Sequence, residues 1–261
     1  MDVRHDRSSY KSGFPAEARR KLPVLFIVGD STVHNVSGGR VGWGDVIGKY
    51  FDTNKIIVSN RALGGRSSRT FITQGWWDRV LASGRRGDFV LIQLGHNDGG
   101  PIDDTNRARG SLPGIGNEST NIFNPVTRHP ETVHTYGWYL RKYIADARAK
   151  GMTPIICSPV PHLPRQTVKS GDVEASSYVV WSGEVAANAN VRFINLNRIV
   201  TGHYAGMTPA QIRTNYFTPF DNTHFNAAGA ELNAESVIEG LRELDCPLKN
   251  YLSNGPSAES R

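Results

Sequence analysis

The chain has few cysteines and no long apolar run, and these two features exclude several classes of protein. Only two of its 261 residues are cysteines, Cys157 and Cys246. This count excludes a disulfide framework and a cysteine-based metal site, so we expect two free thiols. The longest apolar stretches, such as 24–28 and 89–94, have the length of strands and are too short to cross a bilayer. We therefore expect a soluble protein without a membrane partner.

Basic runs and nucleotide-binding fingerprints are also missing. The formal net charge is +6, but the lysines and arginines are scattered, which is typical of a solvated surface. We therefore expect no nucleic acid partner. The glycines at 42–48 match neither the dinucleotide pattern nor the P-loop pattern. A Gly-x-Ser-x-Gly elbow is absent too, which argues against the common α/β-hydrolase fold.

Both ends of the chain are polar. Residues 1–22 have no apolar core and so do not resemble a signal peptide; we expect them to form an N-terminal extension. We expect 247–261, with its Ser, Asn, Gly and Pro, to be a flexible tail, which leaves one domain at 23–246. The compartment stays open: cytoplasmic if Met1 is the native start, periplasmic or secreted if a signal peptide was removed. The oligomeric state stays open as well.

Short apolar runs alternate with amphipathic segments along this domain. Five runs predict strands buried on both faces, at 24–28, 55–59, 89–94, 153–158 and 191–196. Helices are expected at 43–51, 76–82, 132–150, 177–189 and 227–244. This alternation predicts an α/β fold, namely a three-layer α/β/α sandwich around a five-stranded parallel sheet of flavodoxin-like order.

Polar motifs follow the first three predicted strands. The first strand is followed by GDST at 29–32, the second by GGRS at 64–67 and the third by GHND at 95–98. In parallel sheets the ligand crevice lies beyond the carboxyl ends of the strands, so these motifs are expected to meet there. A fourth motif, DNTH at 221–224, precedes the last predicted helix and can return to the same edge.

Together the four motifs supply the groups of a serine esterase. A hydroxyl nucleophile needs a base, a carboxylate that orients the base, and donors that hold the oxyanion. Ser31, His224 and Asp221 can fill the first three roles. The Ser31 N–H, the Gly65 N–H and the Asn97 amide can form the oxyanion hole. Each motif alone is also typical of a turn or a helix cap, so the prediction of catalysis depends on their conjunction.

The same motifs resemble the four blocks of the SGNH (GDSL) hydrolases, whose catalytic set is Ser, Gly, Asn and His. The longer stretches NRALGGRS at 60–67 and DNTHFNAAGA at 221–230 are similar to the rhamnogalacturonan acetylesterase branch. The resemblance implies that 23–246 is an SGNH hydrolase domain of flavodoxin-like fold that needs no metal or other cofactor. It further implies removal of acetyl groups from a plant cell-wall polysaccharide, such as rhamnogalacturonan or another pectin, through an acetyl-enzyme.

Several side chains near the expected crevice are candidates for substrate contact. Arginine matches carboxylate geometry, so pairing with a galacturonate-containing polymer is predicted for Arg66, Arg69, Arg107 and Arg109. Stacking on sugar rings and packing in the core both fit Trp76, Trp77, Tyr136 and Trp138. The segment 99–130 is rich in Gly and Pro and lacks periodicity. We interpret it as a loop that walls the substrate site, with a mobile surface insertion as the alternative.

Other functions stay open at this stage. The substrate can instead be acetylated xylan or another acetylated oligosaccharide, or the enzyme can be a broad-specificity arylesterase or lipase. The polar loop argues against a lipase, which needs an apolar acyl groove. A carbohydrate-binding or acyl-transfer protein that does not hydrolyse is a third alternative, although pure binding does not require Ser31, Asn97, Asp221 and His224 together. The sequence determines neither the polymer nor the acetyl position.

Overall fold

The computed structural model of the chain describes residues 22–171 and 176–253. Its central sheet is parallel and runs in the order β2-β1-β3-β6-β7, which is the flavodoxin-like order. The predicted fold class is therefore confirmed, and each predicted strand boundary is correct to within two residues. The strands are β1 (Val24–Gly29), β2 (Ile57–Asn60), β3 (Phe89–Gln93), β6 (Thr153–Cys157) and β7 (Arg192–Ile194).

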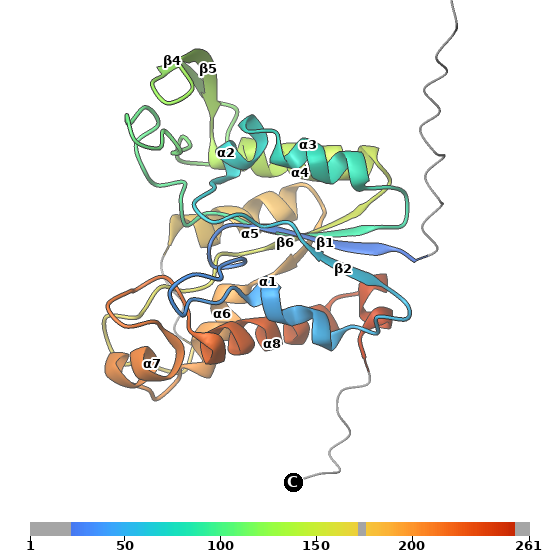
Figure 1. Cartoon of the computed structure of the whole chain (residues 1–261), viewed down its shortest axis with the longest axis vertical. Helices are drawn as coiled ribbons and strands as arrows, with labels where there is room; N and C mark the ends of the chain where they lie inside the picture. Colours follow the sequence, from blue (N-terminus) through green and yellow to red (C-terminus); the bar gives the residue numbers. More distant parts are fainter. Residues whose placement is uncertain (1–21, 172–175, 254–261) are drawn as a thin grey trace, which may run out of the picture.

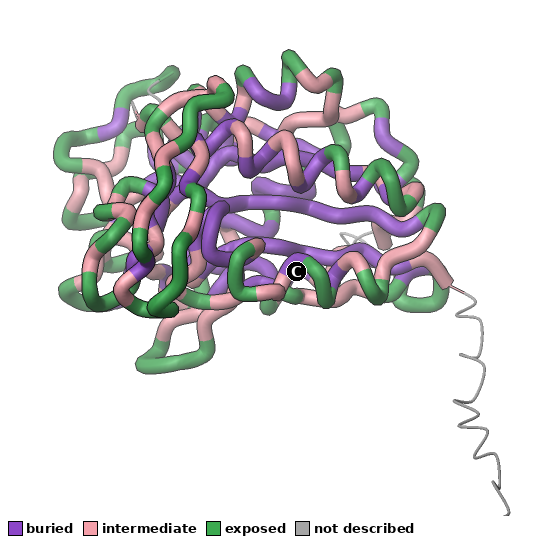
Figure 2. The backbone as a smooth tube through the Cα atoms, turned by 90° about the horizontal axis from the view of Figure 1, so that it is seen from above, coloured by how far each residue is buried: buried purple, intermediate pink, exposed green. Residues whose placement is uncertain are grey.

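Helices cover both faces of this sheet (Figure 1). One layer contains α2 (Ser68–Thr73), α3 (Trp76–Ser83), α4 (Tyr136–Ala149) and α5 (Ser177–Asn188). The opposite layer contains α1 (Trp43–Val46), α6 (Leu196–His203), α7 (Pro209–Tyr216) and α8 (Ala227–Glu243). Side chains of a strand alternate between the two faces. In β1, accordingly, Phe26 packs in the first layer and Leu25 in the second, and both β1 and β3 are buried along their whole length (Figure 2). The edge strand β2 is exposed or half-buried instead, which corrects the prediction that 55–59 is buried on both faces.

The long fourth helix begins later than predicted. We expected a helix at 132–150, but residues up to 134 belong to β5 (His129–His134), which pairs antiparallel with β4 (Ser119–Asn124). The Thr135 side chain accepts a hydrogen bond from the Trp138 N–H at 3.1 Å, so it caps the helix and fixes its start. The predicted loop at 99–130 therefore contains a strand of a small hairpin.

The C-terminal boundary of the domain also differs from the prediction. We expected a flexible tail from 247, but η2 (Pro247–Tyr251) is a 3₁₀ helix whose Leu248 is fully buried. Leu252 then forms an isolated β-bridge with Phe51, so the segment 247–252 packs onto the domain. The predicted helix at 43–51 is split into α1 and the 3₁₀ helix η1 (Ile47–Tyr50).

Two further sequence predictions concern the ends of the chain and its two cysteines. The N-terminal extension predicted at 1–22 lies outside the described residues except for Leu22, as does the tail from 254 onward. Cys157 and Cys246 are both buried free thiols, as predicted. Among the helices of 22–171 and 176–253, none combines the length and apolarity needed to span a membrane.

Candidate active site

The four polar motifs lie at the carboxyl edge of the sheet. Ser31 follows β1, Gly65 follows β2 and Asn97 follows β3. Because β2 and β3 flank β1 on opposite sides, the chain reverses its direction across the sheet here. Such a switch point opens a crevice between the loops that leave adjacent strands.

Ser31, His224 and Asp221 form a continuous hydrogen-bonded chain. The Ser31 Oγ lies 2.8 Å from His224 Nε2. The other ring nitrogen of His224, Nδ1, lies 2.7 Å from Asp221 Oδ2. The imidazole can therefore accept the serine proton at Nε2 while its Nδ1–H is held by the carboxylate. The structure thus brings together the three groups that the sequence predicts as nucleophile, base and orienting acid.

A short closed loop between α7 and α8 carries the last two of these groups. An isolated antiparallel bridge between Phe217 and Phe225 closes the base of this loop. The Asp221 Oδ1 accepts the backbone N–H of Thr223 at 2.8 Å and that of His224 at 3.0 Å. The loop therefore fixes the carboxylate against the imidazole by local bonds alone.

The charge on Asp221 is stabilised by its surroundings. Burial by itself raises the pKa of Asp221, but hydrogen bonds from the Thr223 and His224 backbone and from the His224 ring lower it below its ordinary value. The Arg40 guanidinium lies 3.2 Å from Asp221 Oδ2 and adds a positive charge there. The carboxylate is therefore ionised at neutral pH and can stabilise an imidazolium.

A second histidine–carboxylate pair lies directly behind the nucleophile. Asp30 is fully buried, and its Oδ1 accepts the N–H and the hydroxyl of Thr32 at 2.9 Å and 2.8 Å. Its Oδ2 lies 3.1 Å from Nδ1 of His96, whose Nε2 donates to the Val160 carbonyl at 2.9 Å. Burial raises the pKa of Asp30, but the charge and hydrogen bond of His96 lower it overall. This pair ties the Ser31 loop to the loops after β3 and β6.

Asp98 holds the Asn97 loop in a similar way. It is fully buried and accepts hydrogen bonds from the backbone N–H and the hydroxyl of Ser68, the first residue of α2. Burial raises the pKa of this carboxyl to about 6. The sequence places Asp30, His96 and Asp98 in the motifs, but only the structure shows that they position their neighbours.

The predicted oxyanion-hole donors border the same cleft as Ser31. Gly65 has a φ of 76°, a left-handed conformation in which a side chain is strained. Asn97 is 8% exposed, and its Nδ2 donates one hydrogen to the Arg66 carbonyl at 2.8 Å. An amide nitrogen carries two hydrogens, so this bond leaves the second one for another acceptor.

Removing the Asn97 amide tests this geometry. We expect Asn97→Ala to lower kcat on a small acetyl ester by about 10²–10³, because one oxyanion-hole donor is lost. The KM is expected to change little, since the donor binds charge that develops only in the transition state. Steady-state kinetics measures both values. Asn188→Ala, on an exposed position of α5, is the matched control; a kcat within twofold of the unaltered enzyme for Asn97→Ala contradicts the prediction.

The cleft around Ser31 is large and cationic. Its volume is about 780 Å³, and Asp and Glu are absent from the described residues that line it. Arginines from three segments line it instead: Arg40, Arg66, Arg107 and Arg109. The segment 99–130 contributes Asn106, Arg107, Arg109 and Val126 to this lining. Arg40 is a cleft residue that the sequence analysis missed, because nothing local marks it.

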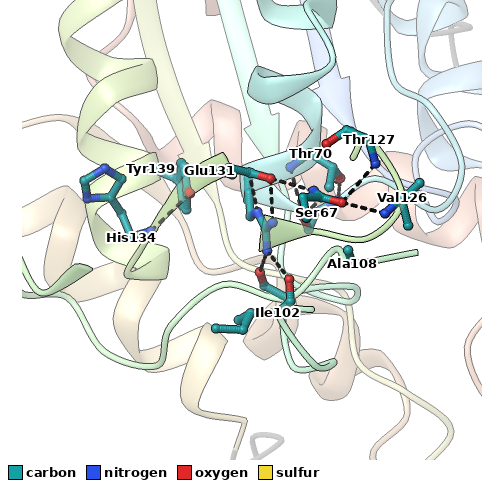
Figure 3. A network of polar contacts seen from close by, with 12 residues as sticks. Ser67, Thr70, Ile102, Ala108, Val126, Thr127, Glu131, His134 and Tyr139 are labelled. Carbon is teal, nitrogen blue, oxygen red and sulfur yellow. Dashed lines mark hydrogen bonds and ion pairs between the residues drawn. The ribbon is translucent and has the colours of Figure 1, made fainter. Parts of the chain in front are cut away.

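Arg69 was predicted to contact substrate, and the structure corrects this. Its side chain is completely buried and donates to both carboxylate oxygens of Glu131 at 2.7 Å. It also donates to the carbonyls of Ile102 and Gly110 at 2.8 Å each (Figure 3). All of these partners belong to the 99–130 segment or the adjoining strand β5, so Arg69 holds the cleft wall rather than the substrate.

The four aromatic candidates for sugar stacking lie away from the described lining of the cleft. Trp77 is buried and its Nε1 donates to Asp146 at 3.0 Å. Tyr136 is buried as well, and its hydroxyl donates to the Leu94 carbonyl at 2.8 Å. Trp76 packs against the Arg79 guanidinium, and Trp138 stacks on the His134 ring. The alternative of core packing therefore describes them better.

Within 22–171 and 176–253, no cluster of three or more His, Cys, Asp or Glu suits a metal ion.

Comparison with known proteins shows which family and which relatives the chain is similar to. The model of the GDSL-like Lipase/Acylhydrolase family matches residues 27–232. The chain is 30% identical over 230 residues to the probable rhamnogalacturonan acetylesterase YesY of Bacillus subtilis, covering 86% of this chain and 94% of that protein. It is 28% identical over 219 residues to the rhamnogalacturonan acetylesterase of Emericella nidulans, covering 84% of each.

Solved structures show the same fold. The crystal structure of YxiM from Bacillus subtilis matches with a TM-score of 0.67 at 23% identity over 85% of this chain. The chain spans 56% of the length of that protein. An acetyl xylan esterase, AlAXEase, matches with a TM-score of 0.54 at 14% identity, covering 84% of this chain and 99% of the other. At these identities the likeness concerns the fold alone.

Proposed function

This chain belongs to the GDSL-like lipase/acylhydrolase family, and on that premise we propose that it removes O-acetyl groups from a plant cell-wall polysaccharide. Rhamnogalacturonan is the polymer we favour, because two of the relatives are named rhamnogalacturonan acetylesterases. The observation that carries the proposal is the Ser31–His224–Asp221 chain, with distances of 2.8 Å and 2.7 Å between its hydrogen-bonded atoms.

The proposed reaction proceeds through an acetyl-enzyme. Ser31 Oγ attacks the acetyl carbonyl while His224 Nε2 takes its proton, and Asp221 stabilises the imidazolium. The oxyanion is held by the Ser31 N–H, the Gly65 N–H and the Asn97 amide. His224 then protonates the departing sugar oxygen. Water, deprotonated by the same imidazole, finally attacks the acetyl carbonyl and releases acetate with the free serine.

The lining of the cleft favours a short acyl group on a polar substrate. Val36 and Val126 are the only apolar aliphatic side chains among the described lining residues. A long acyl chain requires an extended apolar surface, which this wall does not offer. An open polar cleft of about 780 Å³ instead suits several sugar residues that carry acetyl groups.

Acetate release from a panel of acetylated polysaccharides tests the proposal. We expect kcat/KM to be highest on acetylated rhamnogalacturonan and lower on acetylated xylan and mannan. Ser31→Ala supplies the background rate for each polymer. Highest activity on xylan contradicts the favoured polymer, whereas acetate release equal to the Ser31→Ala background on every polymer contradicts the acetylesterase itself.

A further inference from the structure

We propose that His34 binds a free hydroxyl group of the acetylated sugar, beside the ester that Ser31 attacks. The inference rests on the proposed acetylesterase function and adds to it a residue that selects the substrate. It concerns a third histidine–carboxylate pair, His34 with Asp45, which the catalytic mechanism does not use.

The His34 side chain lies within one turn of the nucleophile. The Asp30 carbonyl accepts the backbone N–H groups of Val33 and His34 at 3.1 and 3.0 Å, so residues 30–34 form a single helical turn. Side chains three positions apart on such a turn are neighbours, with about 5–6 Å between their Cβ atoms. Ser31 and His34 have this spacing, and both line the cleft. A group bound at His34 therefore lies beside the ester under attack.

One carboxylate fixes the orientation of the His34 ring. The Nδ1 atom of His34 lies 2.6 Å from Asp45 Oδ1. A carboxylate only accepts hydrogen bonds, so Nδ1 carries the proton, and Nε2 of the neutral ring is then an acceptor. Asp221 holds the ring of His224 in the same way, through Nδ1 at 2.7 Å. The neutral His34 ring is therefore confined to the tautomer that accepts a hydroxyl proton at Nε2.

Asp45 is itself held from several sides. Its Oδ2 accepts the backbone N–H groups of Asn35 and Gly42 at 3.0 and 3.2 Å. Its Oδ1 also accepts the side-chain amide of Asn60, the last residue of β2, at 2.8 Å. These bonds tie the carboxylate to the sheet and to the start of α1. The His34 ring is therefore pre-organised, which reduces the entropy that is lost when a ligand binds.

The second ring nitrogen of His34 is available to a ligand. The side chain is 40% exposed, and Nε2 has no hydrogen-bond partner among the residues that the structure describes. His96, by contrast, uses both ring nitrogens inside the protein. His224 Nε2 already contacts Ser31 Oγ at 2.8 Å, so the reaction has its base without His34. A sugar offers hydroxyl groups next to its acetylated oxygen, and these are the donors that Nε2 of His34 can accept.

Paired substrates test this role. A methyl galactoside that carries one acetyl group between two free hydroxyls is compared with the analogue in which hydrogen replaces both hydroxyls. We expect the unaltered enzyme to prefer the hydroxylated compound by about tenfold in kcat/KM, because the analogue leaves Nε2 of His34 without a partner. A ratio of the two kcat/KM values near one overturns the proposal.

A single variant assigns the preference to His34. His34→Phe keeps a planar ring but removes Nε2, and we expect it to bring the ratio to about one. If His34 only holds its own loop in place, this variant lowers both rates equally and keeps the ratio of the unaltered enzyme, which overturns the proposal. His129→Phe makes the same change at an exposed position of β5 and is expected to keep the ratio.

Nitrogen NMR of the imidazoles separates this proposal from the proposed function, because it requires no hydrolysis. Spectra of Ser31→Ala are recorded at a pH where the rings are neutral, and the His34 signals are those missing from Ser31→Ala/His34→Phe. We expect a proton on Nδ1 of His34 and a shift of its Nε2 signal when the acetylated galactoside is added. This result supports the hydroxyl site even if the unaltered enzyme releases no acetate.

Three outcomes of the NMR experiment overturn the proposal. The first is a proton on Nε2 of His34 in the neutral ring. The second is an Nε2 signal that stays unchanged at saturating galactoside. The third is an Nε2 shift that the analogue without the two hydroxyls reproduces.

Discussion

Ser31→Ala is expected to lower kcat on acetyl esters by roughly 10⁴–10⁶, the largest effect of any single substitution in this chain. The Ser31 hydroxyl is the group that lies 2.8 Å from His224 Nε2, and without it no acetyl-enzyme can form. The residual rate comes from the oxyanion donors and from substrate binding. Hydrolysis of a small acetyl ester measures the loss, and mass spectrometry detects the acetylated serine in the unaltered enzyme.

Two further variants, His224→Ala and Ser31→Ala/His224→Ala, test whether the two residues act together. Residues that act as one unit are not additive, so we expect the double variant to be about as slow as either single variant. Ser83→Ala, at the last position of α3, is the matched control for loss of a serine hydroxyl. If Ser31→Ala hydrolyses the ester as fast as Ser83→Ala, Ser31 is not the nucleophile.

The parts of the fold that the sequence predicts are those governed by local patterns. The inner strands of a parallel sheet are buried on both faces, so they occur as short apolar runs that can be recognised in the sequence. The Ser31–His224–Asp221 chain was foreseeable because strand ends converge and because Asp221 and His224 are only three positions apart. The start of α4 was missed because β5 and the Thr135 cap depend on pairing with β4.

The contacts that the sequence does not predict join residues far apart in the chain. Asp30 and His96 meet across 66 positions, and Arg69 and Glu131 across 62. An arginine near a cleft motif is expected at the surface. A buried guanidinium needs a carboxylate and several carbonyl groups placed within hydrogen-bond distance of its N–H groups. No periodicity shows that Glu131, Ile102 and Gly110 supply these acceptors to Arg69.

Because Glu131, Ile102 and Gly110 all accept hydrogen bonds from Arg69, we expect substitution of Arg69 to have the largest effect on the free energy of unfolding. We expect Arg69→Met to lower the free energy of unfolding by about 3–5 kcal/mol, because it leaves the partly buried Glu131 carboxylate and two carbonyls without their donor. Burial raises the pKa of Glu131, but hydrogen bonds from Arg69 and Asn124 lower it overall. The pair therefore stabilises the fold above the unfolded-state pKa of Glu131, and this contribution is lost as pH falls through the folded-state value. Urea denaturation at neutral and acidic pH measures both effects.

A double-mutant cycle distinguishes the loss of the pair from the loss of packing. Glu131→Leu alone leaves the buried Arg69 charge unpaired, so we expect it to be destabilising as well. In Arg69→Met/Glu131→Leu no buried charge is left, and we expect this variant to be clearly more stable than the sum of the single changes predicts. Strict additivity would mean that the two side chains contribute independently.

Because Arg69 also holds the carbonyls of Ile102 and Gly110, its loss is expected to release the wall that carries Arg107 and Arg109. The KM for acetylated rhamnogalacturonan is therefore expected to rise in Arg69→Met even at temperatures where the protein remains folded.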